Sequence, residues 1–98
     1  MNTPYFLIEE EKLEQNLRLL RSAAERAGCK ILLAQKAYSV YQTYPLISAY
    51  LDGSTASGVY EARLGREEFG KEVHAYSPAF REEDVKELAS LCDHIVFN

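Results

Sequence analysis

The 98-residue chain is 47% hydrophobic and 27% charged, which is typical of one small globular domain and excludes a disordered or fibrous protein. Its net charge of -4, with 11 basic residues spread among 15 acidic ones, argues against a nucleic-acid-binding surface. No apolar run approaches the roughly 20 residues that span a bilayer, and residues 1–4 lack a signal-peptide pattern, so we expect a cytoplasmic protein.

The first half of the chain alternates strand-like and helical patterns. A short apolar run over residues 5–8 predicts a strand, and apolar residues recur at helical spacing over residues 13–27. Gly28 predicts the end of this helix, since glycine readily adopts the left-handed conformation found there. Residues 30–34 then predict a buried strand, and residues 40–51 carry a second helical stripe.

The second half continues the alternation. Residues 54–56 predict a short strand, and Ser57 is placed to cap a helix over residues 58–69. The remaining predicted elements are a strand, a helix and a strand over residues 72–76, 81–91 and 94–98. In the last helix we expect Val85 and Leu88 to face inward.

Strands that alternate with helices through short connections indicate a parallel α/β sheet. Periodicity alone leaves a barrel and a doubly wound open sheet as alternatives. The final predicted strand has no helix after it, and an eight-unit TIM barrel needs about 250 residues. We therefore expect a chain truncated near the fourth strand, with open sheet edges.

Lys36 is the main candidate for chemistry. It lies two residues past the predicted strand that ends at Ala34, and ligands of parallel α/β folds bind at the carboxyl ends of the strands. The small side chain of Ala34 leaves room for a flat ring beneath the amine. A lysine in this position is also commonly a solvated edge residue, so the pattern alone leaves both interpretations open.

Four stretches carry a family resemblance, over residues 29–39, 50–57, 60–74 and 93–98. They closely resemble the carboxynorspermidine (carboxyspermidine) decarboxylases, which belong to the alanine racemase-like pyridoxal-phosphate enzymes together with ornithine and diaminopimelate decarboxylases. The resemblance implies that residues 1–98 are the N-terminal part of a TIM (β/α)8 barrel, with the rest of the barrel and a C-terminal β domain absent. It also implies decarboxylation of carboxynorspermidine or carboxyspermidine to norspermidine or spermidine, with the isolated 98 residues inactive.

By this resemblance, Lys36 matches the lysine that binds pyridoxal 5'-phosphate covalently, and it is the one predicted catalytic and cofactor-binding residue. A primary amine is required because it condenses with the cofactor aldehyde and is then displaced by the substrate amine. The implied partners are a small polyamine substrate and a second copy in a homodimer, without nucleic acid or membrane. No metal site is predicted, because Cys92 and His94 lack a second ligand pair, and Cys29 and Cys92 are expected to be reduced, buried thiols.

Several other residues have competing interpretations. Ser54 falls where related decarboxylases carry a carboxylate, which favours a structural role, and His74 is interpreted as a strand residue satisfied by hydrogen bonds. Tyr38, Tyr76 and Asn98 lie near strand ends and are candidates for lining the mouth of the site. Two alternatives to the leading function remain: a non-catalytic, self-associating barrel fragment, and a related decarboxylase of the diaminopimelate or ornithine type.

Overall fold

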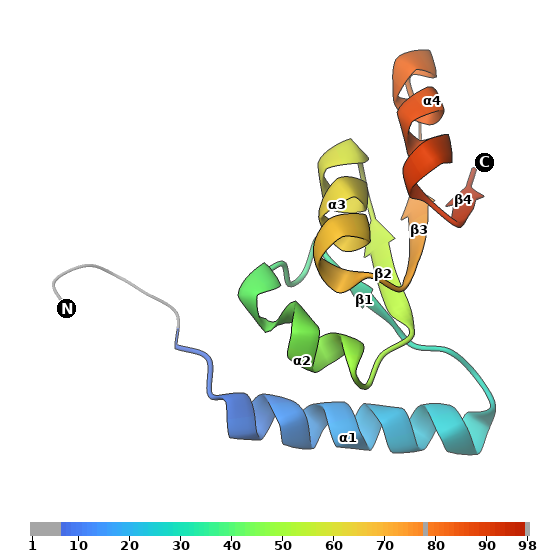
Figure 1. Ribbon diagram of the computed structural model, residues 1–98. Helices are drawn as coiled ribbons and strands as arrows, with labels where there is room; N and C mark the ends of the chain where they lie inside the picture. The colour runs from blue at the N-terminus through green and yellow to red at the C-terminus, as the bar shows by residue number, and fades with distance from the viewer. Residues whose placement is uncertain (1–6, 78, 98) are drawn as a thin grey trace, which may run out of the picture.

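The computed structural model describes residues 7–77 and 79–97. Its elements in chain order are α1 (Glu10–Ala27), β1 (Leu32–Ala34), η1 (Tyr41–Thr43), α2 (Tyr44–Ser48), β2 (Gly53–Ala56), α3 (Val59–Leu64), η2 (Gly65–Phe69), β3 (Glu72–Tyr76), α4 (Glu82–Leu91) and β4 (His94–Val96). The four strands form one parallel sheet in the order β1-β2-β3-β4 (Figure 1). This confirms the predicted parallel α/β class, and sequential parallel strands are how the successive units of a (β/α)8 barrel are arranged.

Of the first two predicted elements, the strand over residues 5–8 is not found in the described part of the chain, whereas the helix after it ends where the sequence predicted. Residues 5 and 6 of the expected first strand lie outside the described residues, and Leu7 and Ile8 belong to no strand, so this part of the prediction is wrong. Among the described strands β1 pairs with β2 alone, so Leu7 and Ile8 do not extend the sheet. The following helix ends at Ala27 as predicted, with Gly28 in the left-handed conformation at φ 66°.

The segment predicted as one helix over residues 58–69 begins as α3 and continues as a π-helix, η2. The predicted cap by Ser57 is wrong, because Gly58 occupies the N-cap position and no side chain caps the helix. Instead, the Ser57 backbone N–H donates a hydrogen bond of 2.9 Å to the Glu61 carboxylate. An acidic side chain in the first turn of α3 thus accepts the hydrogen bond of a backbone N–H that precedes the helix.

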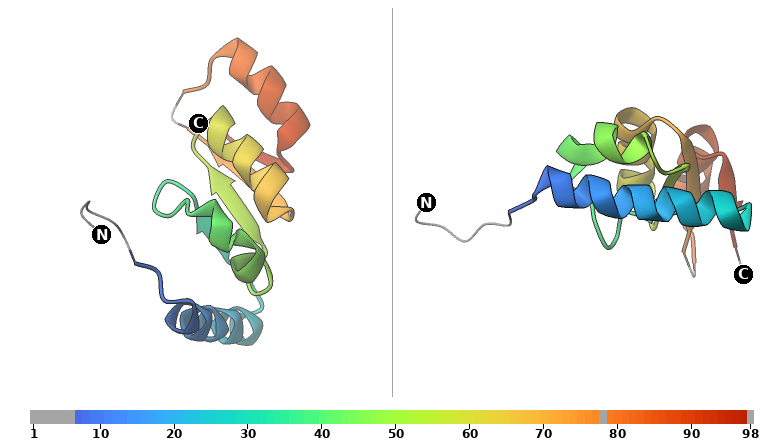
Figure 2. Two further views of the ribbon diagram at one scale, coloured as in Figure 1. Left: turned by 60° about the vertical axis from the view of Figure 1, so that its left-hand side comes forward. Right: turned by 90° about the horizontal axis from the view of Figure 1, so that it is seen from below.

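The side chains of the strands alternate between two faces of the sheet. Leu33, Val73 and Ile95 pack into clusters with apolar side chains of the helices, so their face is the covered one. α2, α3 and α4 lie on this side of the sheet (Figures 1 and 2). α1 runs past the lower ends of the strands in the view of Figure 1. The alternate strand residues lie on the helix-free face, which would form the interior of a barrel.

The core on the covered face has two clusters. The first joins α1, α2 and η2 through Leu17, Tyr44, Ile47, Leu51 and Phe69, and the second joins β2, α3, β3 and α4 through Ala56, Ala62, Val73, Ala75 and Leu88. Leu88 is fully buried as predicted. The expectation for Val85 is wrong: its side chain is 40% exposed, because it lies one turn earlier in α4 and outside the second cluster.

Gly65 brings η2 into direct contact with the sheet. A Cβ atom at this position would overlap Ser54 Oγ and lie 3.0 Å from Gln35 Nε2. We expect Gly65→Ala to lower the free energy of unfolding by about 1–3 kcal/mol, because a methyl group has no space in this well-packed contact. The measurement is urea denaturation.

Two further variants control this prediction. Gly58→Ala adds the same methyl group where no atom lies within 4 Å, so its effect is expected to be smaller. In a Ser54→Ala background the overlapping oxygen is gone, and the cost of Gly65→Ala should fall. Equal costs for Gly65→Ala with and without Ser54 Oγ would contradict the proposed close contact.

Candidate active site

Lys36 lies in the turn that follows β1, at the carboxyl end of the parallel strands. The Ala34 carbonyl holds this turn by accepting hydrogen bonds from the N–H groups of Ala37 at 3.0 Å and Tyr38 at 3.2 Å. The lysine is exposed and forms no ion pair within residues 7–77 and 79–97. Its position therefore agrees with the sequence prediction, and its amine is accessible to a reactive aldehyde.

Gln35, the residue before Lys36, anchors the turn to the helices. Its side chain is only 2% exposed, and its Nε2 donates to the backbone oxygens of Glu61 at 2.7 Å and Thr55 at 3.3 Å. Its Oε1 accepts a hydrogen bond of 2.9 Å from the Tyr44 hydroxyl. Sequence reasoning missed this residue, because glutamine is usually exposed and its three partners come from other elements.

Tyr44 supports Gln35 from inside the first core cluster. Its side chain is fully buried, and its ring packs edge-to-face against Phe69 with centroids 5.5 Å apart. Burial raises the pKa of Tyr44 to about 12, so its hydroxyl stays protonated near neutral pH. It therefore remains a hydrogen-bond donor to Gln35 at neutral pH.

Ser54 lies on the covered face of β2, where its Oγ is buried without a hydrogen-bond partner among the described residues. Its neighbour Thr55 lies on the opposite, helix-free face and is the register partner of Ala34. Ser54 is thus a strand residue packed against η2, as the structural interpretation expected, and it does not share a face with Ala34.

The structure also describes three of the other four residues that the sequence analysis discussed. The Tyr38 hydroxyl forms a 2.7 Å hydrogen bond with Thr43 Oγ1, and its ring packs against the first core cluster. Tyr76 is 44% exposed at the end of β3, whereas Asn98 lies outside the described residues. His74 is hydrogen-bonded within the sheet as predicted, through its Nε2 and a Glu72 oxygen at 3.3 Å.

Both cysteines are free thiols, as predicted. Cys92 is half-buried, and this burial raises the pKa of its thiol. The expectation of a buried thiol is wrong for Cys29, which is exposed because it follows the end of α1 in the loop before β1. Over the described residues, no helix is long and apolar enough to span a membrane.

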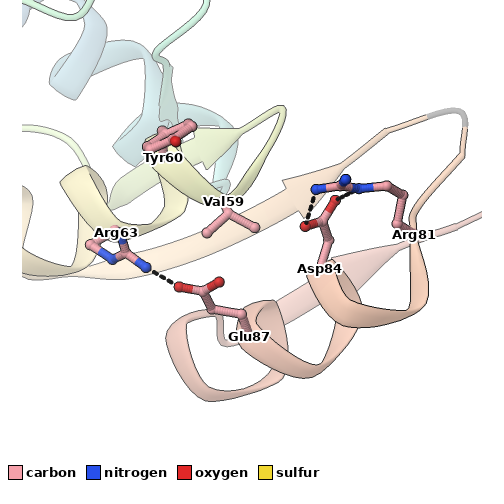
Figure 3. Close-up of a pocket in the computed structure, with 6 residues that line it drawn as sticks. All are labelled: Val59, Tyr60, Arg63, Arg81, Asp84 and Glu87. Carbon is pink, nitrogen blue, oxygen red and sulfur yellow. Dashed lines mark hydrogen bonds and ion pairs between the residues drawn. The ribbon is translucent and has the colours of Figure 1, made fainter.

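A cavity of about 190 Å³ lies between α3 and α4 on the covered side of the sheet (Figure 3). Its charged side chains are paired: Arg63 with Glu87, and Arg81 with Asp84 at 3.0 and 3.1 Å. Arg63–Glu87 joins α3 to α4 at the surface, whereas Arg81–Asp84 lies within the start of α4. The cavity does not include Lys36, so we do not assign it to the candidate active site.

No protein-family model matches the chain, but individual proteins do. It is 45% identical over all 98 residues to a carboxynorspermidine/carboxyspermidine decarboxylase of Campylobacter jejuni, and 42% identical over 98 residues to one of Herminiimonas arsenicoxydans. It is 41% identical over 96 residues to a carboxyaminopropylagmatine decarboxylase of Synechocystis. These matches cover 98–100% of this chain and 25–27% of the relatives.

A solved structure agrees with the sequence comparison. The crystal structure of the Campylobacter jejuni carboxynorspermidine decarboxylase, complexed with norspermidine, matches with a TM-score of 0.95 over 100% of this chain and 27% of that chain. The chain thus spans about a quarter of the length of the relatives it matches. In sequence and in fold, these 98 residues correspond to the N-terminal part of the carboxynorspermidine/carboxyspermidine decarboxylases.

Proposed function

We propose that the chain supplies the cofactor-binding lysine of a pyridoxal-phosphate-dependent decarboxylase, acting on carboxynorspermidine or carboxyspermidine in polyamine biosynthesis. The observation that carries this proposal is the exposed Lys36 at the carboxyl end of β1, in a chain that matches a solved decarboxylase with a TM-score of 0.95. We further propose that residues 1–98 are the N-terminal part of a barrel domain. The complete protein would then act as a homodimer in the cytoplasm.

The residues around Lys36 fit this role. The amine is accessible, and Ala34 and Thr55 provide small side chains on the helix-free face next to it. When bound, pyridoxal phosphate supplies an electron sink for the electrons left by departing carbon dioxide. Lys36 would bind the cofactor through Nζ and, once displaced by the substrate amine, could hold or transfer a proton there.

Gln35 contributes by positioning. Its three hydrogen bonds to Glu61, Thr55 and Tyr44 restrict the backbone one residue before Lys36. A restricted backbone reduces the conformational freedom lost when the amine is brought to the cofactor. We therefore assign Gln35 a positioning role, without contact to substrate.

A second substrate is favoured by one comparison. The relative in Synechocystis is named a carboxyaminopropylagmatine decarboxylase and is 41% identical, close to the 42% and 45% of the other two. All three names describe loss of a carboxyl group from a carboxylated polyamine. Lys36 would therefore have the same role, binding the cofactor, whichever of these substrates the protein uses. Diaminopimelate and ornithine remain alternative substrates to be tested beside them.

Chemical trapping tests the assignment of Lys36. Incubating the full-length protein with pyridoxal phosphate and reducing it with sodium borohydride makes a lysine–cofactor linkage permanent, and peptide mass analysis locates it. We expect the added mass at Lys36, because a formed site favours one amine over the others. Lys86, which is exposed on α4, is the matched control and should remain unmodified.

The result has two clear outcomes. Modification confined to Lys36, and retained in Lys86→Arg, supports the proposal. Labelling scattered over Lys36, Lys86 and other exposed lysines would show that no cofactor site is formed around Lys36 and would overturn it.

A further inference from the structure

Three potential metal ligands meet on the helix-free face of the sheet. Glu72 and His74 alternate along β3, and His94 begins β4, where it is the register partner of His74. His74 Nε2 lies 3.3 Å and His94 Nε2 lies 3.7 Å from the same Glu72 oxygen, Oε1. One ligand atom from each of the three residues lies within 4.8 Å of the others.

These distances resemble the edges of a zinc coordination shell. With metal–ligand bonds of about 2.0–2.1 Å for histidine nitrogen and carboxylate oxygen, neighbouring ligands of a tetrahedral ion lie about 3.3 Å apart. The separations of 3.3 and 3.7 Å are therefore already close to those required. The ligand atoms of the two histidines lie within 4.8 Å of each other, so the imidazole rings must rotate to converge on one ion.

The two imidazole rings are stacked, with centroids 4.4 Å apart and an angle of 29° between their planes. Neutral imidazole is the form that binds metal. The stacking places the two rings side by side on the helix-free face, and they must rotate out of the stack for both to supply a nitrogen to one ion.

Lys30 holds Glu72 from its other side. Its Nζ donates a 2.6 Å hydrogen bond to Glu72 Oε2, so Oε1 is left facing the two histidines. This hydrogen bond is also the main reason that the pKa of Glu72 is lowered, which keeps the carboxylate charged. An outer group that orients a ligating carboxylate is a common part of protein metal sites.

We propose that Glu72, His74 and His94 bind a divalent transition-metal ion of the zinc type, each providing one ligand, with water completing the shell. Two imidazoles and one carboxylate suit zinc and its neighbours, whereas calcium and magnesium prefer oxygen ligands. The His94 side chain is 59% exposed in these 98 residues, on the face that would line the interior of a complete barrel. The ion would cross-link β3 and β4, and the inference does not depend on the decarboxylase activity.

The test uses the full-length protein carrying Cys29→Ser, because the exposed thiol of Cys29 could otherwise bind zinc by itself. After metal removal with a chelator, Zn²⁺ is titrated in competition with a chromophoric chelator. We expect His74→Gln and His94→Gln each to weaken binding roughly tenfold or more, because each removes one of three protein ligands. Glu68→Gln, at an exposed carboxylate of η2, is the control and should bind as before.

Equal Zn²⁺ affinity in both histidine variants and in the Glu68→Gln control would overturn the proposal. Circular dichroism of each variant shows whether it is folded. If a histidine variant does not fold, histidine NMR signals of the Cys29→Ser protein decide instead, since bound Zn²⁺ must shift the signals of both His74 and His94. Signals that do not change with Zn²⁺ would likewise overturn the site.

Discussion

Replacing Lys36 by alanine is expected to lower the release of carbon dioxide from carboxynorspermidine by the full-length protein roughly a thousandfold or more. The reason is the loss of the primary amine that would bind the cofactor covalently. Lys36 is exposed and forms no ion pair within the described residues, so its removal should leave the fold intact. The measurement is steady-state carbon dioxide release, with circular dichroism to verify folding.

Two variants separate nucleophilicity from charge. Lys36→Arg keeps the positive charge, but its guanidinium stays protonated and cannot condense with an aldehyde, so it should be nearly as inactive as Lys36→Ala. Lys86→Ala removes an exposed lysine on α4 and should keep full activity. A Lys36→Arg protein with nearly full activity would contradict the assignment of Lys36 as the nucleophile.

Truncating Tyr44 to alanine is expected to lower the free energy of unfolding by about 3–5 kcal/mol, the range found when large aromatic side chains are removed from a core. Tyr44 is fully buried and packs edge-to-face on Phe69, so truncation leaves a cavity between α2 and η2. It also removes the donor to Gln35 Oε1, which would be left unpaired in the interior. Urea denaturation measures the loss.

Comparison variants divide this loss into its parts. Tyr44→Phe keeps the ring and removes only the hydroxyl, so we expect a cost of about 1–2 kcal/mol. Tyr60→Ala removes the same side chain where it is 86% exposed and should change stability by less than about 0.5 kcal/mol. If Tyr44→Ala cost no more than Tyr60→Ala, Tyr44 would not be a core residue.

The Tyr44 variants also test the link between the core and the candidate site. Gln35 connects the Tyr44 hydroxyl to the turn that carries Lys36, so the positioning of the amine depends on a residue in a different element. Neither the burial of Gln35 nor this connection could be predicted from sequence. The reason is that glutamine is usually exposed, and its three partners come from residues 9, 20 and 26 positions away.

Errors in the sequence prediction have a similar origin. The Ser57 cap followed a correct rule, but the backbone at Gly58 took the N-cap position and Glu61 supplied the hydrogen bond. Val85 follows the helical stripe with Leu88, yet the second core cluster takes in Leu88 and Leu91 of α4 and not Val85. Both depend on where neighbouring elements come to lie, and a local pattern does not contain that information.

The sequence by itself determined the alternation of strands and helices, the end of α1 at Gly28 and the position of Lys36 at the end of a strand, because backbone preferences and side-chain periodicity act locally. Only the tertiary structure decided which distant side chains meet. Parallel pairing of β3 and β4 places His74 beside His94, 20 residues later, and Glu72 beneath both. Such contacts follow from the register of the sheet, which is set by the packing of the whole covered face.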